Sequence, residues 1–246
     1  MVLPQDLRAD LEALPWAGAP RVPPPCSAPG PAWLSVEAEP GGDALTLRTP
    51  ALHLTITLRP ALHLAWALVM DGKAVAVASD RASRPYTFSL ASDRMEHAMA
   101  RLPGDAFYGL GDKTGPLNLA GRRLRTDMTD ALGYCARTGD PLYKHWPFLL
   151  ARDAGSGGCY GLLYDSLPFC AFDLGAEHCN YYGRYRVYQS AGDLDYYFLA
   201  GPQLADVVRR FSWLSGAAAM PPRWSLGFAL TAMPLADAAD AQAAEQ

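Results

Sequence analysis

The amino-acid sequence predicts a mainly β protein: an antiparallel β-sandwich followed by the beginning of an α/β unit. Three observations predict this fold. Apolar and polar residues alternate with a period of two in short segments, as expected for half-buried strands. Clusters of Gly, Pro, Asp and Ser separate these segments. Half of the 246 residues are hydrophobic and 19% are charged, a composition that favours a packed core over a disordered chain.

Residues 1–31 are predicted to precede the sandwich. Their first part has apolar residues at helical spacing, which fits either a short docking helix or a partly ordered tail: Leu3, Leu7, Leu11 and Leu14. Residues 20–31 then hold six of the 21 prolines, so we expect an extended lead-in there. The sandwich itself is predicted over 32–202.

The strand pattern is clearest in the first half of this domain. In residues 52–58 the apolar side chains of Leu52, Leu54 and Ile56 fall on one face. Asp71-Gly72 is a favoured two-residue hairpin turn between predicted strands at 62–70 and 73–78. Further strands are predicted at 45–49, 86–90, 105–110, 146–151, 159–164, 168–173, 184–188 and 193–199.

A connecting helix and linker are predicted over 203–222, because the apolar residues of 204–214 recur at helical spacing and Gly216 provides a C-terminal cap. Residues 223–230 then have the apolar character of a buried strand, and an alanine-rich helix start follows from Pro234. A strand followed by a helix is typical of an α/β domain. We therefore expect 223–246 to begin a second domain that these residues do not complete.

Charge and cysteine content argue against several classes of protein. A net charge of −4 disfavours nucleic acid as a partner, and no apolar run reaches the roughly 18 residues of a membrane span. Five cysteines without a Cys-x-x-Cys pair suggest neither a disulfide framework nor a zinc site. No cofactor or metal is expected. The first ten residues lack the layout of a secretory signal, so a cytoplasmic location is expected.

Several motifs in the second half together resemble a known family. They are Phe107-Tyr-Gly-Leu-Gly-Asp, Arg125-Thr-Asp, Asp140-Pro-Leu-Tyr-Lys-His-Trp-Pro-Phe, Gly192-Asp-Leu-Asp-Tyr-Tyr-Phe-Leu-Ala-Gly-Pro and Met220-Pro-Pro-Arg-Trp-Ser-Leu-Gly-Phe. In this order and spacing they resemble the N-terminal region of glycoside hydrolase family 31, the α-glucosidase and α-xylosidase family. The resemblance is specific over about 100–231.

The resemblance implies a galactose-mutarotase-like β-sandwich ahead of a (β/α)₈ catalytic barrel, with 224–230 as the first barrel strand. The other barrel strands need roughly 200 further residues. The family retains configuration by using two carboxylates about 5 to 5.5 Å apart, and both lie on later barrel strands. The resemblance therefore implies that this chain holds no catalytic residue and is inactive alone. It also implies that the partner of the sandwich is the missing catalytic barrel of the same protein. The sugar, the linkage, the oligomeric state and the choice among hydrolase, transglycosylase and lyase stay open.

The resemblance also implies a substrate-binding role for Asp127 and Thr126. The family's usual asparagine-threonine-aspartate segment matches Arg125-Thr126-Asp127, and its aspartate can hydrogen-bond sugar hydroxyls. A carboxylate accepts bonds from two adjacent hydroxyls and so orients a sugar ring. Arg125 departs from the family pattern. The alternative for Asp127, Asp130 and Asp140 is a solvated loop in which aspartates cap turns.

Other candidate groups have both a functional and a structural interpretation. Tyr143, Lys144, His145 and Trp146 form either a sugar-binding cluster or an alternating strand, and the strand is favoured. No third glycine completes a phosphate-binding motif, so Gly109 and Gly111 are expected to permit either close backbone approach or a bulge in a strand.

An acid–base pair, which a sugar epimerase would need, is not convincing in the sequence. Glu96 and His97 are neighbours, as are Glu177 and His178, and neighbouring residues of a strand point to opposite faces. A distant pairing such as His145 with Glu177 is disfavoured. The leading hypothesis is the N-terminal part of a retaining α-glycosidase that acts on an α-linked sugar, and the alternative is a non-catalytic carbohydrate-binding or scaffold module.

Overall fold

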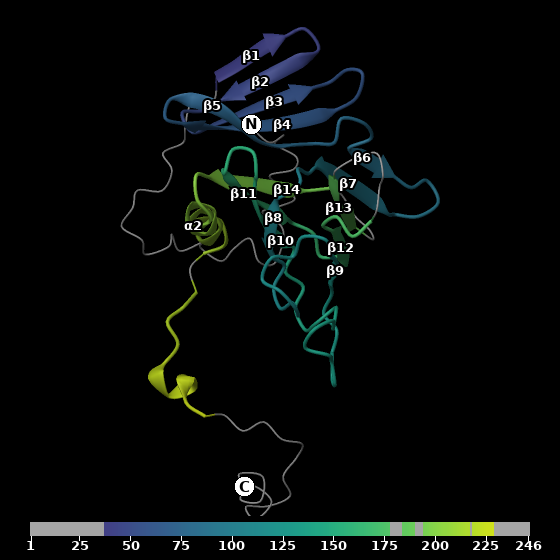
Figure 1. Ribbon diagram of the computed structural model, residues 1–246, viewed down its shortest axis with the longest axis vertical. Coiled ribbons are helices and arrows are strands. Elements are labelled where there is room, and N and C mark those ends of the chain that lie inside the picture. Colours follow the sequence, from purple (N-terminus) through teal and green to yellow (C-terminus); the bar gives the residue numbers. More distant parts are fainter. Residues whose placement is uncertain (1–36, 178–183, 190–193, 217, 229–246) are drawn as a thin grey trace, which may run out of the picture. The chain divides into compact units, whose positions relative to one another are not determined.

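The computed structural model describes residues 37–177, 184–189, 194–216 and 218–228. The chain divides into two compact units. The described part of the first unit, residues 26–215, contains three antiparallel sheets and one helix (Figure 1). The second unit consists of residues 1–25 and 216–246, of which only 216 and 218–228 are described. The predicted helix or tail at 1–15, the proline-rich lead-in and the helix start after Pro234 lie outside the described residues.

The first sheet is a meander in which each strand pairs with the next one along the chain. Its strands are β1 (Glu37–Gly41), β2 (Ala44–Arg48), β3 (Leu52–Thr57), β4 (His63–Met70) and β5 (Lys73–Ser79). Asp71 and Gly72, which join β4 to β5, have positive φ angles of 50° and 75°. Both central residues of a type I′ turn require positive φ, so the predicted hairpin turn is confirmed.

The other two sheets combine pairs of consecutive strands with pairs of strands that are distant in sequence. One has the order β14 (Tyr196–Gly201), β11 (Cys159–Tyr164), β10 (Phe148–Arg152) and β8 (Ala106–Gly109). The other has the order β6 (Tyr86–Phe88), β7 (Met95–Ala100), β13 (Arg184–Gln189), β12 (Cys170–Asp173) and β9 (Arg123–Thr126). These pairings place β9 at the edge of its sheet.

Strand β11 lies at the centre of the packing because it is covered on both faces. Leu162 and Tyr164 point into a core shared with β12 and with the first sheet. On the opposite face, Cys159 packs with Phe148 and with Val207 of α2 (Leu204–Ser215). A Cβ atom on Gly161 would lie 2.7 Å from the Phe148 ring and 2.8 Å from Val207, so glycine permits this close approach of helix and sheet.

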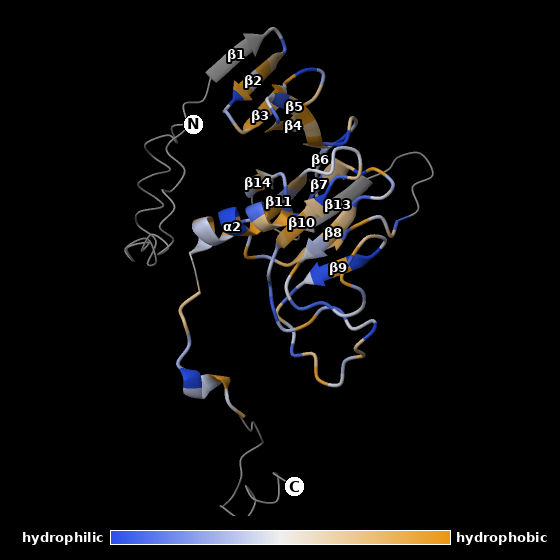
Figure 2. Ribbon diagram, turned by 60° about the vertical axis from the view of Figure 1, so that its left-hand side comes forward, coloured by the Kyte–Doolittle hydropathy of each residue, from blue (hydrophilic) through white to orange (hydrophobic). Residues whose placement is uncertain are grey.

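Most predicted elements are confirmed, with ends that agree or differ by up to three residues, and three described strands were not predicted. Strand β7 reads Met-Glu-His-Ala-Met-Ala, which combines helix-forming residues without alternation. It is a strand because it is paired on both sides and largely buried. Strand β9 has only four residues and is hydrophilic, as its blue colour shows (Figure 2). Strand β1, with Pro40 and Gly41, was also missed.

The predicted strand at 223–230 is wrong over its described part. Residues Arg223–Leu226 form a single 3₁₀ turn, with bonds from the N–H of Ser225 to the Pro222 carbonyl and from the N–H of Gly227 to the Trp224 carbonyl. Trp224 and Phe228 are 83% and 86% exposed. A strand needs a neighbour for its backbone groups, and none pairs with these described residues, so local bonds form instead. No helix in the described part is long and apolar enough to span a membrane.

Candidate functional site

The outer side of β9 is held by side chains instead of by another strand. The Asp140 carboxylate accepts a hydrogen bond from the backbone N–H of Arg125 at 2.7 Å and pairs with the Lys113 ammonium at 3.0 Å. Lys113 also donates to the Arg125 carbonyl. The two side chains of this ion pair are only 4% and 13% exposed. Both backbone groups of Arg125 are therefore fixed one residue before Thr126.

Thr126 and Asp127, the two predicted binding residues, occupy different environments. Thr126 is fully buried and its hydroxyl donates to the Cys170 carbonyl at 3.3 Å. Asp127 is half-buried just beyond β9, and its backbone carbonyl accepts a bond from the N–H of Thr129. The Asp127 carboxylate has no partner among the described residues. A carboxylate in this state is able to accept hydrogen bonds from an added ligand.

His145 contacts the residue that precedes Asp127. Its Nδ1 lies 2.9 Å from the Thr126 carbonyl oxygen, and its Nε2 lies 2.7 Å from the Ser166 carbonyl oxygen. The disfavoured pairing of His145 with Glu177 does not occur; Glu177 instead lies 3.6 Å from the Arg123 guanidinium.

Exposed aromatic rings accompany this segment. Residues 143–146 do not form the favoured alternating strand, because β10 begins only at Phe148. Tyr143 and Trp146 are 43% and 48% exposed, and Tyr143 packs edge-on against Tyr134. A Cβ atom on Gly111 would lie 2.9 Å from the Cβ of Trp146, which confirms that this glycine permits close approach. The rings belong to the same loop as His145.

The remaining acidic and basic residues of this region are placed differently from Asp127. Asp130 is exposed, and Asp140 is committed to Lys113 and Arg125. Asp112 forms a surface ion pair with Lys144 at 3.1 Å. Among the described residues, no group of three or more His, Cys, Asp or Glu side chains is arranged to hold a metal ion.

A second polar cluster, which the sequence did not reveal, lies in the core. Asp80 and His97 are both 1% exposed, and His97 Nε2 donates to Asp80 Oδ1 at 3.0 Å. Asp80 Oδ2 accepts bonds from the Tyr86 hydroxyl at 2.7 Å and from the N–H of Leu64 at 2.8 Å. With a neutral imidazole, Nδ1 accepts a bond from the Tyr164 hydroxyl at 2.9 Å. Every polar group of Asp80 and His97 is thus paired inside the fold.

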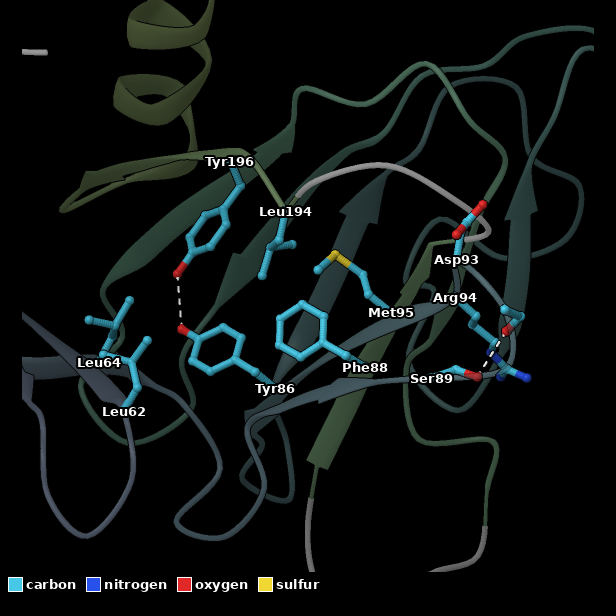
Figure 3. Close-up of a pocket in the computed structure, with 11 residues that line it drawn as sticks. Leu62, Leu64, Tyr86, Phe88, Ser89, Asp93, Arg94, Met95, Leu194 and Tyr196 are labelled. Carbon is cyan, nitrogen blue, oxygen red and sulfur yellow. Dashed lines mark hydrogen bonds between the residues drawn. The ribbon is translucent and has the colours of Figure 1, made fainter. Parts of the chain in front are cut away.

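Tyr86 of this cluster and Tyr196, whose ring stacks on that of His97, line a cavity of about 910 Å³ (Figure 3). Tyr86 and Tyr196 approach each other through their hydroxyls at 3.5 Å, and Phe88 adds a third ring that is 64% exposed. Burial raises the pKa of Tyr86 and of Tyr196 above their ordinary values. Both hydroxyls therefore stay protonated, which suits hydrogen bonding and not base catalysis. Asp93 and Arg94 lie at the rim.

The two regions support different chemistry. His97 and Asp80 are too buried to touch a substrate, so the core cluster cannot act as an acid–base pair on a sugar. The loop after β9 presents an unpaired carboxylate on a fixed backbone, with exposed aromatic rings nearby. This combination is suited to binding a polyhydroxylated ligand, because aromatic faces pack on sugar rings and carboxylates accept from hydroxyls.

Comparison with protein families gives a match over most of the described sandwich. The model of the glycosyl hydrolase 31 N-terminal galactose mutarotase-like domain matches residues 24–173. This range includes β1 to β12 and the loop that carries Asp127.

Individual relatives agree with this match. An α-glucosidase of Bacillus thermoamyloliquefaciens is 32% identical over 127 residues, which cover 50% of this chain and 15% of the relative. The α-xylosidase XylQ of Lactiplantibacillus pentosus is 28% identical over 127 residues, or 52% of this chain and 15% of that protein. The chain thus spans about one seventh of the length of these relatives.

Among solved structures, a family 31 dextranase of Flavobacterium johnsoniae in complex with glucose superposes with a TM-score of 0.68. The two share 25% sequence identity, and the match covers 78% of this chain and 22% of the dextranase. The fold of the described sandwich is therefore that of the N-terminal domain in this group of proteins.

Proposed function

The chain belongs to glycosyl hydrolase family 31, through its N-terminal galactose mutarotase-like domain, and from this premise we propose that it is the N-terminal part of a retaining α-glycosidase. In this role the sandwich supplies the loop after β9 to a sugar-binding site, where Asp127 accepts hydrogen bonds from the hydroxyls of an α-linked glucoside or xyloside. The catalytic carboxylates belong to a barrel outside the sandwich. These 246 residues alone bind sugar without cleaving it.

One observation carries this proposal. The half-buried Asp127 carboxylate has no partner within the described part of the chain, although the backbone before it is held at Arg125 by Asp140 and Lys113. A carboxylate that served only to cap its own loop would bond to nearby N–H groups. Asp127 is instead fixed in place with its hydrogen-bonding capacity unused, as a binding group must be.

Exposed apolar side chains at the loop ends support a partner surface. Large apolar residues that are at least 78% exposed stand in loops of the sandwich: Leu117, Met128, Leu132 and Leu167. Large exposed apolar side chains are typical of surfaces that another domain covers. We propose the catalytic barrel as that domain.

The test is a titration of the chain with isomaltotriose and with maltotriose, followed by NMR. Asp127→Asn keeps the shape of the side chain and removes its charge, and loss of a charged hydrogen bond weakens binding by about tenfold. Asp130→Asn, in the same loop and exposed, is the matched control and leaves binding unchanged. Equal affinity of wild type and Asp127→Asn contradicts the proposed role, and so does an absence of saturable binding. Release of glucose from an α-glucoside by the purified chain contradicts the assignment of catalysis to a barrel.

The aromatic cavity favours a second candidate function, a non-catalytic carbohydrate-binding module. Tyr86, Phe88 and Tyr196 provide rings and hydroxyls, and Asp93 and Arg94 provide charged groups at the rim. Phe88→Ala tests this site without disturbing the core, because Phe88 is 64% exposed. Leu90→Ala, which is fully exposed outside the cavity, is its control. If only Phe88→Ala reduces sugar binding and Asp127→Asn does not, the binding-module function replaces the first.

A further inference from the structure

His145 joins three segments that are far apart in sequence. Its ring stands in the loop before β10 and contacts one carbonyl 19 residues earlier, at Thr126, and another 21 residues later, at Ser166. Carbonyl oxygens only accept hydrogen bonds, so the ring donates in one of the two contacts when it is neutral and in both when it is charged. One half-buried side chain thus connects the end of β9 with the loop between β11 and β12.

The Thr126 carbonyl is the last backbone group before Asp127 that a distant side chain holds. At Arg125 the N–H is held by Asp140 and the carbonyl by Lys113. Within residues 127–129 the described structure has one backbone bond, and it is local: the N–H of Thr129 donates to the Asp127 carbonyl at 3.2 Å. The orientation of the Asp127 peptide, and hence of its carboxylate, therefore depends on the contact with His145.

We propose that His145 is the positioning residue of the sugar-binding loop: its ring holds the Thr126 carbonyl and thereby sets the direction of the Asp127 carboxylate. This inference rests on the proposed sugar-binding role of Asp127. His145 itself need not touch the sugar, because both of its ring nitrogens already face protein carbonyls.

Two conservative substitutions separate the two contacts. The amide nitrogen of asparagine takes about the position of Nδ1, so His145→Asn keeps the bond to Thr126 and loses the bond to Ser166. The amide nitrogen of glutamine takes about the position of Nε2, so His145→Gln keeps Ser166 and loses Thr126. His63→Asn is the matched control, since His63 also donates from Nε2 to a carbonyl, that of Asp80 at 3.0 Å, but in the first sheet.

Loop order is measured first, without sugar, by amide hydrogen exchange at residues 127–129. His145→Gln is expected to increase exchange there about fivefold or more, the usual result of losing one net hydrogen bond. His145→Asn and His63→Asn leave it near the wild-type rate. Unchanged exchange in His145→Gln, or an equal increase throughout the sandwich, overturns the positioning role.

Sugar affinity is measured second, in a double-mutant cycle with Asp127→Asn. In the wild-type background His145→Gln raises the Kd for isomaltotriose by about the same factor as it raises amide exchange at residues 127–129. In the Asp127→Asn background it leaves the Kd unchanged. His145→Asn retains most of the wild-type affinity. A His145→Gln effect that persists in the Asp127→Asn background contradicts action through Asp127. If Asp127→Asn binds sugar normally while His145→Gln still loosens the loop, the proposed function fails and the positioning of the loop stands.

Discussion

The two histidine-centred clusters of this domain place similar residues in different environments. His97 lies between sheets, where Asp80, Tyr164 and Tyr86 satisfy every polar group of the cluster without solvent. His145 lies at the loop ends and bonds only to backbone carbonyls. The nearby Asp127 carboxylate is left without a partner in the described structure. A satisfied polar group contributes to the fold, whereas an unsatisfied but fixed one is available to a ligand.

Removal of Asp80 is expected to have the largest effect on stability. Asp80→Ala leaves the Tyr86 hydroxyl, the Leu64 N–H and the buried Nε2 of His97 without their acceptor, so the free energy of unfolding falls by about 3–5 kcal/mol. Urea unfolding followed by circular dichroism measures this loss. Asp130→Ala, an exposed aspartate, stays within about 0.5 kcal/mol of wild type. Similar values for the two variants would remove the distinction between the clusters.

Loss of Lys113 is expected to have an intermediate effect, because Asp140 keeps one of its partners. In Lys113→Met the Asp140 carboxylate keeps its hydrogen bond from the Arg125 N–H, and the free energy of unfolding falls by about 1–3 kcal/mol. Lys144→Met breaks only the exposed pair with Asp112 and costs less than about 1 kcal/mol. The same urea titrations compare the two. A larger loss for Lys144 would show that the support of β9 is not where the structure places it.

Thiol labelling compares the exposed loop with the buried core without any substitution. Hydrogen bonds from Thr138 and backbone N–H groups lower the pKa of exposed Cys135, whereas burial raises the pKa of Cys170 to about 11. A lowered pKa gives more thiolate at a given pH, so iodoacetamide labels Cys135 well before Cys170 at pH 8. Peptide mass spectrometry separates these sites from the other cysteines. Labelling of Cys170 should appear only in urea, and early labelling would show that the core around β12 opens readily.

Local pattern was sufficient for much of the fold. The alternation in β3 to β5, the Asp71-Gly72 turn and the α2 helix with Gly216 at its end are each encoded within a few neighbouring residues, and each was predicted correctly. The strand predicted at 223–230 is wrong over residues 223–228, because an apolar segment forms a strand only where a neighbouring strand pairs with its backbone groups. Strand β7 failed for the opposite reason: its residues favour a helix, and pairing with β6 and β13 overrides that preference.

For the candidate site, sequence motifs were sufficient to predict the family and the segment that carries Asp127. The sequence did not indicate which of Asp127, Asp130 and Asp140 is unpaired. It also did not indicate that Thr126 is buried. These features depend on contacts between segments that are distant in sequence: the bond from His145 to Thr126 spans 19 residues, and the bond from His97 to Asp80 spans 17. Turns and amphipathic segments follow from interactions between neighbours. The partners of buried groups and of groups at sheet edges are set by the packing of three sheets around one core. A local sequence pattern carries no information about that packing.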